Sequence, residues 1–342
     1  MFQKGRLSKF ELLRMLAMFM ILLSHYCVHG VRAVTNYNID LLHESFYYLC
    51  SSFGEIAVGI FFMLSGYLLY AKSPNFRRAR NLLGQIYFYS ILFLLVWGGY
   101  RFLGKNQSVI NAEYFINCLF PIGRSTWWFI SVYILLYVAC DSFRCIFDEM
   151  GKNIFIKVIL FFWLFFFFVP AFVGEPFRSL QRGIFFFLCG RYCRIYKPMK
   201  DKSKIVLFIA VIFFLICTVF IDFASVYVSS QFNISEPVMK RFSSGVRSGF
   251  FIPFCAILIF IIFEDIDIGS IKWINTLSAG TFGVYLIHDS PLRMLIWKVF
   301  RIKFAWETPF FALFAFFSCS LLFVLCIAID LLRRKLFKFF LK

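Results

Sequence analysis

Apolar runs of about 20 residues recur along the whole chain, with only short polar gaps between them. An α-helix of that length crosses the hydrocarbon core of a bilayer, because each residue adds about 1.5 Å to the helix axis. Hydrophobic residues make up 61% of the sequence and charged residues 16%, which leaves too little polar surface for a soluble domain. The sequence therefore predicts an all-α, polytopic membrane helical bundle.

Counting the apolar runs gives about ten transmembrane helices. The expected spans are 10–29, 46–71, 82–103, 126–145, 153–173, 178–196, 203–223, 247–264, 277–299 and 307–329. We expect them to form a single transmembrane domain, residues 1–342, with no appended soluble domain.

Lys and Arg at both ends of the chain orient the bundle. An even number of spans places the two termini on one side, and an excess of Lys and Arg marks the cytoplasmic side. We therefore expect both termini in the cytoplasm. The basic residues of 293–303 would then lie outside, so the orientation of the ninth span stays open.

The formal net charge of +18 is compatible with two kinds of anionic partner, nucleic acid and membrane lipid. A nucleic-acid-binding protein presents its basic residues on a water-facing surface, and this chain offers little of it. Its Lys and Arg gather at the ends of expected helices, where they bind anionic headgroups. We expect membrane lipid, and no nucleic acid, among the partners.

The first span, FELLRMLAMFMILLSHY, carries Arg14 near one end and His25 near the other. Eleven residues separate them, about 20° from three full turns, so they share one helix face roughly 16 Å apart. Charged residues in a spanning helix usually face the bundle interior or a water-filled cavity. Two simpler roles stay open: Arg14 reaching the headgroups, and His25 making a structural hydrogen bond.

His29 lies one turn beyond His25, so the two side chains form a two-histidine face. A metal site needs further ligands, and no carboxylate has the spacing to complete one. We therefore expect no metal.

Other polar or small residues stand out in apolar surroundings. Ser65 and Gly66 lie deep in the second span, where small residues let helices approach closely; Ser65 is either a polar partner or a packing residue. Trp128 belongs to a tryptophan pair that opens the fourth span, as in an aromatic belt. His288 lies late in the ninth span, in TFGVYLIHDSP, toward the outer half of the membrane.

In this order, the motifs resemble those of the acyltransferase-3 family of membrane acyltransferases. The resemblance rests on Arg14 and His25 separated by ten residues, FFMLSGYLL, RRAR at 77–80, WWFI, and SAGTFGVYLIH near the end. It covers most of the chain. It implies a ten-span protein of the bacterial cytoplasmic membrane that moves an acyl group, usually acetyl from acetyl-CoA, to a hydroxyl of a surface glycan or glycolipid.

On that resemblance, acetyl-CoA is the acyl donor, and its phosphates would meet Arg14, Arg77 and Arg80 at the cytoplasmic mouth. His25 would act as general base or carry the acyl group itself as a nucleophile. His288 would orient an acceptor or a catalytic group, or make a structural hydrogen bond inside the bundle. The expected acceptor is an extracytoplasmic glycan or glycolipid, and proteins of envelope-polysaccharide biosynthesis are expected partners. The competing interpretation is a transporter or flippase for a sugar-containing or anionic substrate, whose buried Arg and His would form its path.

Overall fold

The computed structural model describes residues 7–31, 41–70, 73–103, 112–122, 127–169, 178–300 and 302–340. Every regular element within these ranges is a helix, which confirms the all-α expectation. In chain order they are α1 (Ser8–His25), η1 (Tyr26–Val31), α3 (Leu41–Leu68), α4 (Phe76–Leu103), α5 (Ala112–Leu119), α6 (Trp128–Val138), α7 (Cys140–Phe147), α8 (Lys152–Trp163), η2 (Leu164–Phe168), α10 (Arg178–Tyr196), α11 (Lys204–Phe232), α12 (Glu236–Val246), η3 (Arg247–Phe251), α13 (Ile252–Asp265), α14 (Lys272–Ser278), α15 (Thr281–His288), α16 (Arg293–Val299), α17 (Ile302–Trp306) and α18 (Phe311–Phe340).

Six helical segments of the described residues are long and apolar enough to cross a bilayer. They are Ser8–Val31, Leu41–Leu68, Phe76–Gly99, Lys204–Phe232, Val238–Asp265 and Phe311–Phe337. The pair α6 and α7, bent by 55°, makes a seventh if it counts as one broken span. The chain is thus a multi-pass membrane protein, while the count of ten spans stays a prediction.

The expected ninth span, 277–299, is wrong as a continuous helix. It consists of α15 and α16, which are separated by residues 289–292, and the last turn of α14 precedes them. Pro291 lacks a backbone N–H and disfavours helical backbone at Ser290, so the helix that ends at His288 does not continue through this segment. The break leaves His288 at a helix C-terminus and Asp289 just beyond it.

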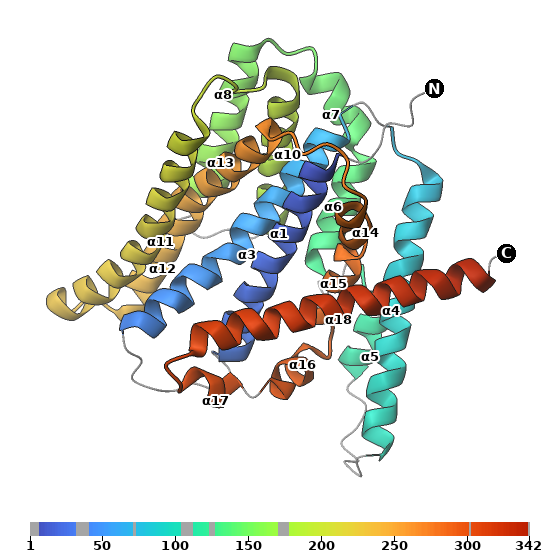
Figure 1. Ribbon diagram of the computed structural model, residues 1–342. Helices are drawn as coiled ribbons and strands as arrows, with labels where there is room; N and C mark the ends of the chain where they lie inside the picture. The colour runs from blue at the N-terminus through green and yellow to red at the C-terminus, as the bar shows by residue number, and fades with distance from the viewer. Residues whose placement is uncertain are drawn as a thin grey trace.

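Three helices form the centre of the bundle: α1 packs along α3, and α3 packs along α10. Figure 1 shows α1 and α3, both blue, side by side through the middle of the molecule. Two glycines set the distance between α3 and α10. A Cβ atom on Gly66 would lie 1.9 Å from the Phe187 carbonyl oxygen, and one on Gly190 would lie 2.0 Å from the Met63 carbonyl oxygen.

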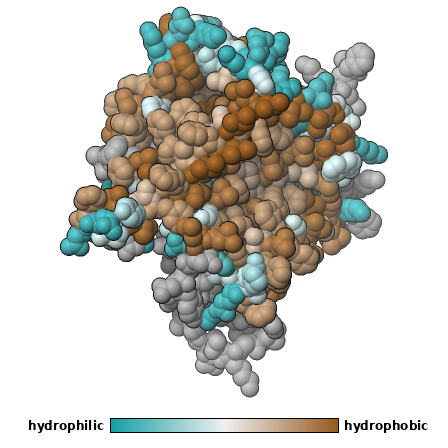
Figure 2. All heavy atoms as spheres, turned by 60° about the vertical axis from the view of Figure 1, so that its left-hand side comes forward, coloured by the Kyte–Doolittle hydropathy of each residue, from teal (hydrophilic) through white to brown (hydrophobic). Residues whose placement is uncertain are grey.

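The outer helices turn apolar side chains outward. Figure 2 shows a face of the molecule that is hydrophobic across its middle, with hydrophilic residues gathered at the top and at the lower left. Exposed apolar side chains are concentrated on α11: Ile205, Val206, Phe208, Ile209, Ile212, Phe213, Ile216 and Phe220. A surface of this kind is suited to contact with lipid.

Candidate active site

A cavity of about 410 Å³ lies among α1, α3, α4, α6, α15 and α18. One face of α1 lines it with Arg14, Met18, Ile21 and His25, which is the helix face that the sequence assigned to Arg14 and His25. These side chains recur at intervals of three or four residues, as one stripe of an α-helix requires. The face that carries them looks into a cavity of the bundle.

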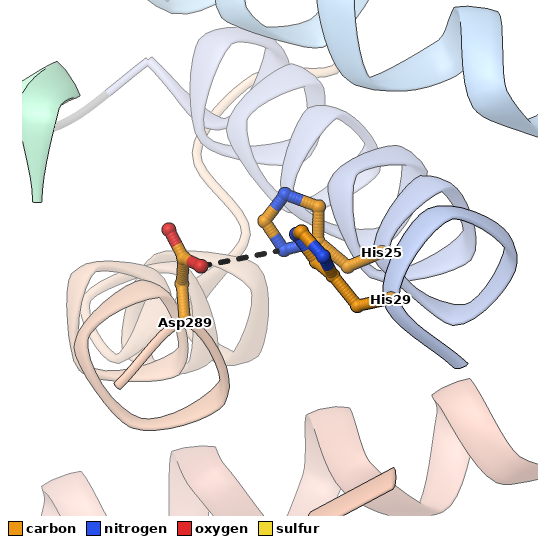
Figure 3. Close-up of side chains that lie close together, drawn as sticks. All are labelled: His25, His29 and Asp289. Carbon is orange, nitrogen blue, oxygen red and sulfur yellow. Dashed lines mark ion pairs between the residues drawn. The ribbon is translucent and has the colours of Figure 1, made fainter. Parts of the chain in front are cut away.

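His25 meets side chains from the far end of the chain. Its Nδ1 atom lies 3.1 Å from Nε2 of His288, 263 residues away in the sequence. The same atom lies 3.9 Å from Oδ1 of Asp289, and Figure 3 shows the two side chains facing each other from α1 and from the segment that follows α15. The break between α15 and α16 therefore brings two polar side chains to one nitrogen of His25.

Burial differs among these groups. The His288 ring is fully buried, and its Nδ1 atom lies 2.7 Å from the Val284 carbonyl oxygen of its own helix. Asp289 is 6% exposed and pairs with Arg293 at 3.3 Å. The His25 side chain keeps 21% of its surface exposed and lines the cavity, so within this cluster His25 is a ring that a substrate in the cavity can reach.

His25, His29 and Asp289 also form a set of metal-ligand types (Figure 3). The expectation that no carboxylate completes the histidine pair is wrong, because the fold brings Asp289 beside the two histidines. Their ligand atoms lie within 4.8 Å of one another, and a tetrahedral zinc site with bonds of about 2.1 Å holds neighbouring ligand atoms about 3.4 Å apart. Asp289 also pairs with Arg293 at 3.3 Å, so a metal ion would compete with that guanidinium for the carboxylate.

Two arginines of the cavity wall have carboxylate partners. Arg14 pairs with Glu11 at 2.6 Å. Arg334 pairs with Asp330 at 2.7 Å, and Arg333 pairs with the other oxygen of Asp330 at 2.9 Å. Arg333 and Arg334 share the single negative charge of Asp330, so this group of three side chains has a net charge of +1.

Arg78 is the third arginine of the cavity wall. Its guanidinium lies 3.4 Å from the Tyr133 hydroxyl and over the Tyr137 ring at 5.5 Å, and no carboxylate of the described residues pairs with it. Arg78 and the neighbouring Asn81 are exposed, so the cavity opens beside the first turns of α4. An unneutralised guanidinium at this mouth is suited to an anionic ligand.

The other residues that the sequence analysis selected lie in different places. Ser65 and Trp128 line the cavity, although the Ser65 hydroxyl donates to the Phe61 carbonyl of its own helix at 2.8 Å. Arg77 and Arg80 are exposed and are not among the residues that line the cavity. The structure thus brings Arg14, His25, Ser65 and Trp128 to one cavity. His288 contacts His25 without lining the cavity, and Arg77 and Arg80 lie outside the cavity wall.

Sequence analysis missed three residues of the cavity wall. Asp289 stands directly after His288 in a motif that it quoted, and Arg78 lies inside RRAR, but neither had a spacing that singled it out. Arg334 belongs to the basic C-terminal cluster, which was used only for topology. Nothing local to these residues predicts which of them faces the cavity.

Comparison with protein-family profiles matches residues 7–332 to the acyltransferase-3 family, whose profile describes an acyltransferase domain. No curated protein and no solved structure gives a match. The matched region includes α1 with Arg14 and His25, the RRAR segment, and the His288–Asp289 pair. The chain therefore belongs to the acyltransferase-3 family and is a multi-pass membrane acyltransferase.

Proposed function

We propose that the protein moves an acyl group, most simply acetyl, from cytoplasmic acyl-CoA to a hydroxyl of an extracytoplasmic glycan or glycolipid. The observation that carries this proposal is one cavity that joins His25 to three arginines, one of which has no carboxylate partner among the residues that the structure describes. Acyl-CoA carries its phosphates far from its thioester. Its binding site therefore needs cationic side chains where the cavity opens, and a base deeper in the cavity. Arg14 and His25, roughly 16 Å apart on one face of α1, provide that separation.

The reaction needs one proton acceptor near the thioester carbonyl. The acceptor hydroxyl attacks the carbonyl carbon and gives its proton to His25. The tetrahedral intermediate then collapses, the bond from carbon to sulfur breaks, and His25 returns the proton to the leaving thiolate. In the alternative route His25 itself attacks the thioester and carries the acyl group before the hydroxyl accepts it.

The arginines hold the donor in this proposal. Arg78 and the Arg334 side chain offer guanidinium groups to the phosphates of coenzyme A, because guanidinium forks pair well with phosphate oxygens. Arg14 contributes less to donor binding, because its charge is offset by Glu11. Asp289, 3.9 Å from His25, stabilises the imidazolium that forms when His25 takes the proton.

Transfer of label from radiolabelled acetyl-CoA tests the function. Membranes that contain wild type, His25→Ala or His43→Gln receive labelled acetyl-CoA and a panel of glycan and glycolipid acceptors, which are then recovered and counted. His43 is the matched control, because it contacts the Trp306 carbonyl at 2.9 Å and does not line the cavity.

We expect label with wild type and His43→Gln, and a fall of about 10²-fold or more with His25→Ala. Full activity in a correctly inserted His25→Ala protein would rule out the mechanism. Absence of label with wild type across the panel, and again with succinyl-CoA, would count against the acyl-CoA donor and favour a transporter.

A further inference from the structure

We infer that His288 fixes the tautomer of His25, so that Nδ1 of His25 carries the hydrogen and Nε2 carries the lone pair. The catalytic role that this inference gives to the tautomer rests on the proposed function. The tautomer itself depends only on which ring nitrogens of His288 and His25 carry hydrogen. It makes His288 a positioning residue, not a catalytic one, since it acts through His25.

The argument starts at a backbone carbonyl. The Val284 oxygen lies 2.7 Å from Nδ1 of His288, and a carbonyl oxygen can only accept a hydrogen bond. Nδ1 of His288 must therefore be the donor and carry a hydrogen. An unprotonated nitrogen in this place would set two lone pairs against each other.

The next step concerns the other nitrogen of His288. The ring is fully buried, and no ion pair joins it to a carboxylate among the residues that the structure describes. A buried positive charge without a partner is costly, so the ring is neutral. A neutral imidazole with a hydrogen on Nδ1 has a lone pair on Nε2.

The lone pair on His288 determines the state of His25. Nε2 of His288 lies 3.1 Å from Nδ1 of His25, so Nδ1 of His25 must donate. Asp289 favours the same arrangement, because its Oδ1 atom lies 3.9 Å from that nitrogen. Both neighbours accept, and both therefore stabilise a hydrogen on Nδ1 of His25.

The remaining nitrogen of His25 is thereby set as the base. In Figure 3 the dashed line to Asp289 ends at the other ring nitrogen, and none of the described residues forms a hydrogen bond with this one. A general base or a nucleophilic imidazole needs this unprotonated nitrogen, and the wrong tautomer in a comparable serine-hydrolase arrangement costs about 10⁴-fold in rate.

Two variants of His288 separate the tautomer role from a packing role. His288→Gln keeps an acceptor, since its side-chain oxygen can reach the place of Nε2, whereas His288→Leu fills the site without one. We expect kcat to fall about 10²-fold or more in His288→Leu and to stay within about tenfold of wild type in His288→Gln. The KM for acyl-CoA should stay unchanged in both, because neither variant touches the arginine mouth.

The tautomer can also be measured without any activity. The chain has only four histidines, so ¹⁵N-histidine labelling in detergent or lipid gives few ring-nitrogen signals, and His25→Asn identifies those of His25. The protonated and unprotonated nitrogens differ in chemical shift. We expect one tautomer in wild type, with hydrogen on Nδ1, and a mixture in His288→Leu.

Each result has a fixed meaning. A hydrogen on Nε2 of His25 in the wild type would overturn the inference, whatever the activity. Equal loss of kcat in well-folded His288→Gln and His288→Leu would overturn the tautomer role in favour of packing. The expected NMR result together with full activity of His25→Ala would leave the tautomer in place and refute the proposed mechanism instead.

Discussion

The helices α1 and α11 reverse the relation between hydrophobicity and burial that holds in soluble proteins. In the span that contains α1, the most apolar window has a mean hydropathy of 1.5, and 56% of that window is buried inside the protein. In the corresponding window of α11 the mean hydropathy is 3.0, and only 22% of the window is buried. The more apolar helix is the more exposed one, because its surroundings are lipid and not water.

The two helices differ in where they keep polar side chains. α1 directs Arg14 and His25 into the cavity. Apart from Lys204 at its first position, α11 has one charged residue, Asp222, which is 5% exposed and pairs with Arg247 at 2.5 Å. Of these two helices, the less apolar one lines the cavity, and the more apolar one turns its interior charge away from lipid. The four predictions below test this contrast.

Removal of Asp222 should have the largest effect on stability. Asp222→Ala leaves Arg247 buried without its partner, and we expect a loss of about 3 kcal/mol in the free energy of unfolding. Denaturant titration in detergent measures it. The double variant Asp222→Ala with Arg247→Met should recover part of the loss. If Asp222→Ala is as stable as wild type, the charge of Arg247 does not depend on Asp222.

A methyl group at the centre of the bundle should cost somewhat less. Gly66→Ala places a Cβ atom 1.9 Å from the Phe187 carbonyl oxygen, so α3 and α10 must move apart. We expect a destabilisation of about 1–3 kcal/mol by the same titration. Gly84→Ala on α4 is the control, since its Cβ would have no neighbour within 4 Å, and it should be neutral or slightly stabilising. Equal effects at the two glycines would refute the close approach.

The arginines of α4 give a smaller effect, on donor binding. Arg78→Ala should raise the KM for acyl-CoA about tenfold, because Arg78 lines the cavity and pairs with no carboxylate in the described part of the chain. Arg77→Ala and Arg80→Ala should each raise it less, since both side chains lie outside the cavity wall. The resemblance to the family predicts the opposite order. Initial rates at varied acyl-CoA, with acceptor in excess, decide between the two.

Truncation of a lipid-facing ring should have the smallest effect. Phe220 on α11 is 69% exposed, so Phe220→Leu should change stability by less than about 0.5 kcal/mol in detergent. Phe62 on α3 is fully buried, and Phe62→Leu should cost about 1 kcal/mol or more, because the core closes poorly over the lost atoms. A larger loss at Phe220 than at Phe62 would contradict the contrast between inner and outer helices.

Much of the candidate site follows from α1 alone. Arg14 and His25 lie on one face because the helix period is local, and a face that carries both cannot meet lipid. The same local rule did not resolve RRAR, where three arginines lie within one turn and only Arg78 lines the cavity. Which side of α4 faces inward depends on the helices packed against it, and that information is not in the motif.

By itself, the sequence determined the class of the protein: apolar runs of bilayer length require helices, and the periodicity of α1 requires a polar inner face. The tertiary structure alone decided which groups surround His25. His288 and Asp289 reach it across more than 260 residues of sequence, at a helix break that the apolar run did not reveal. Helix periodicity acts within a few turns, whereas this contact depends on how α1 and α15 pack inside the bundle.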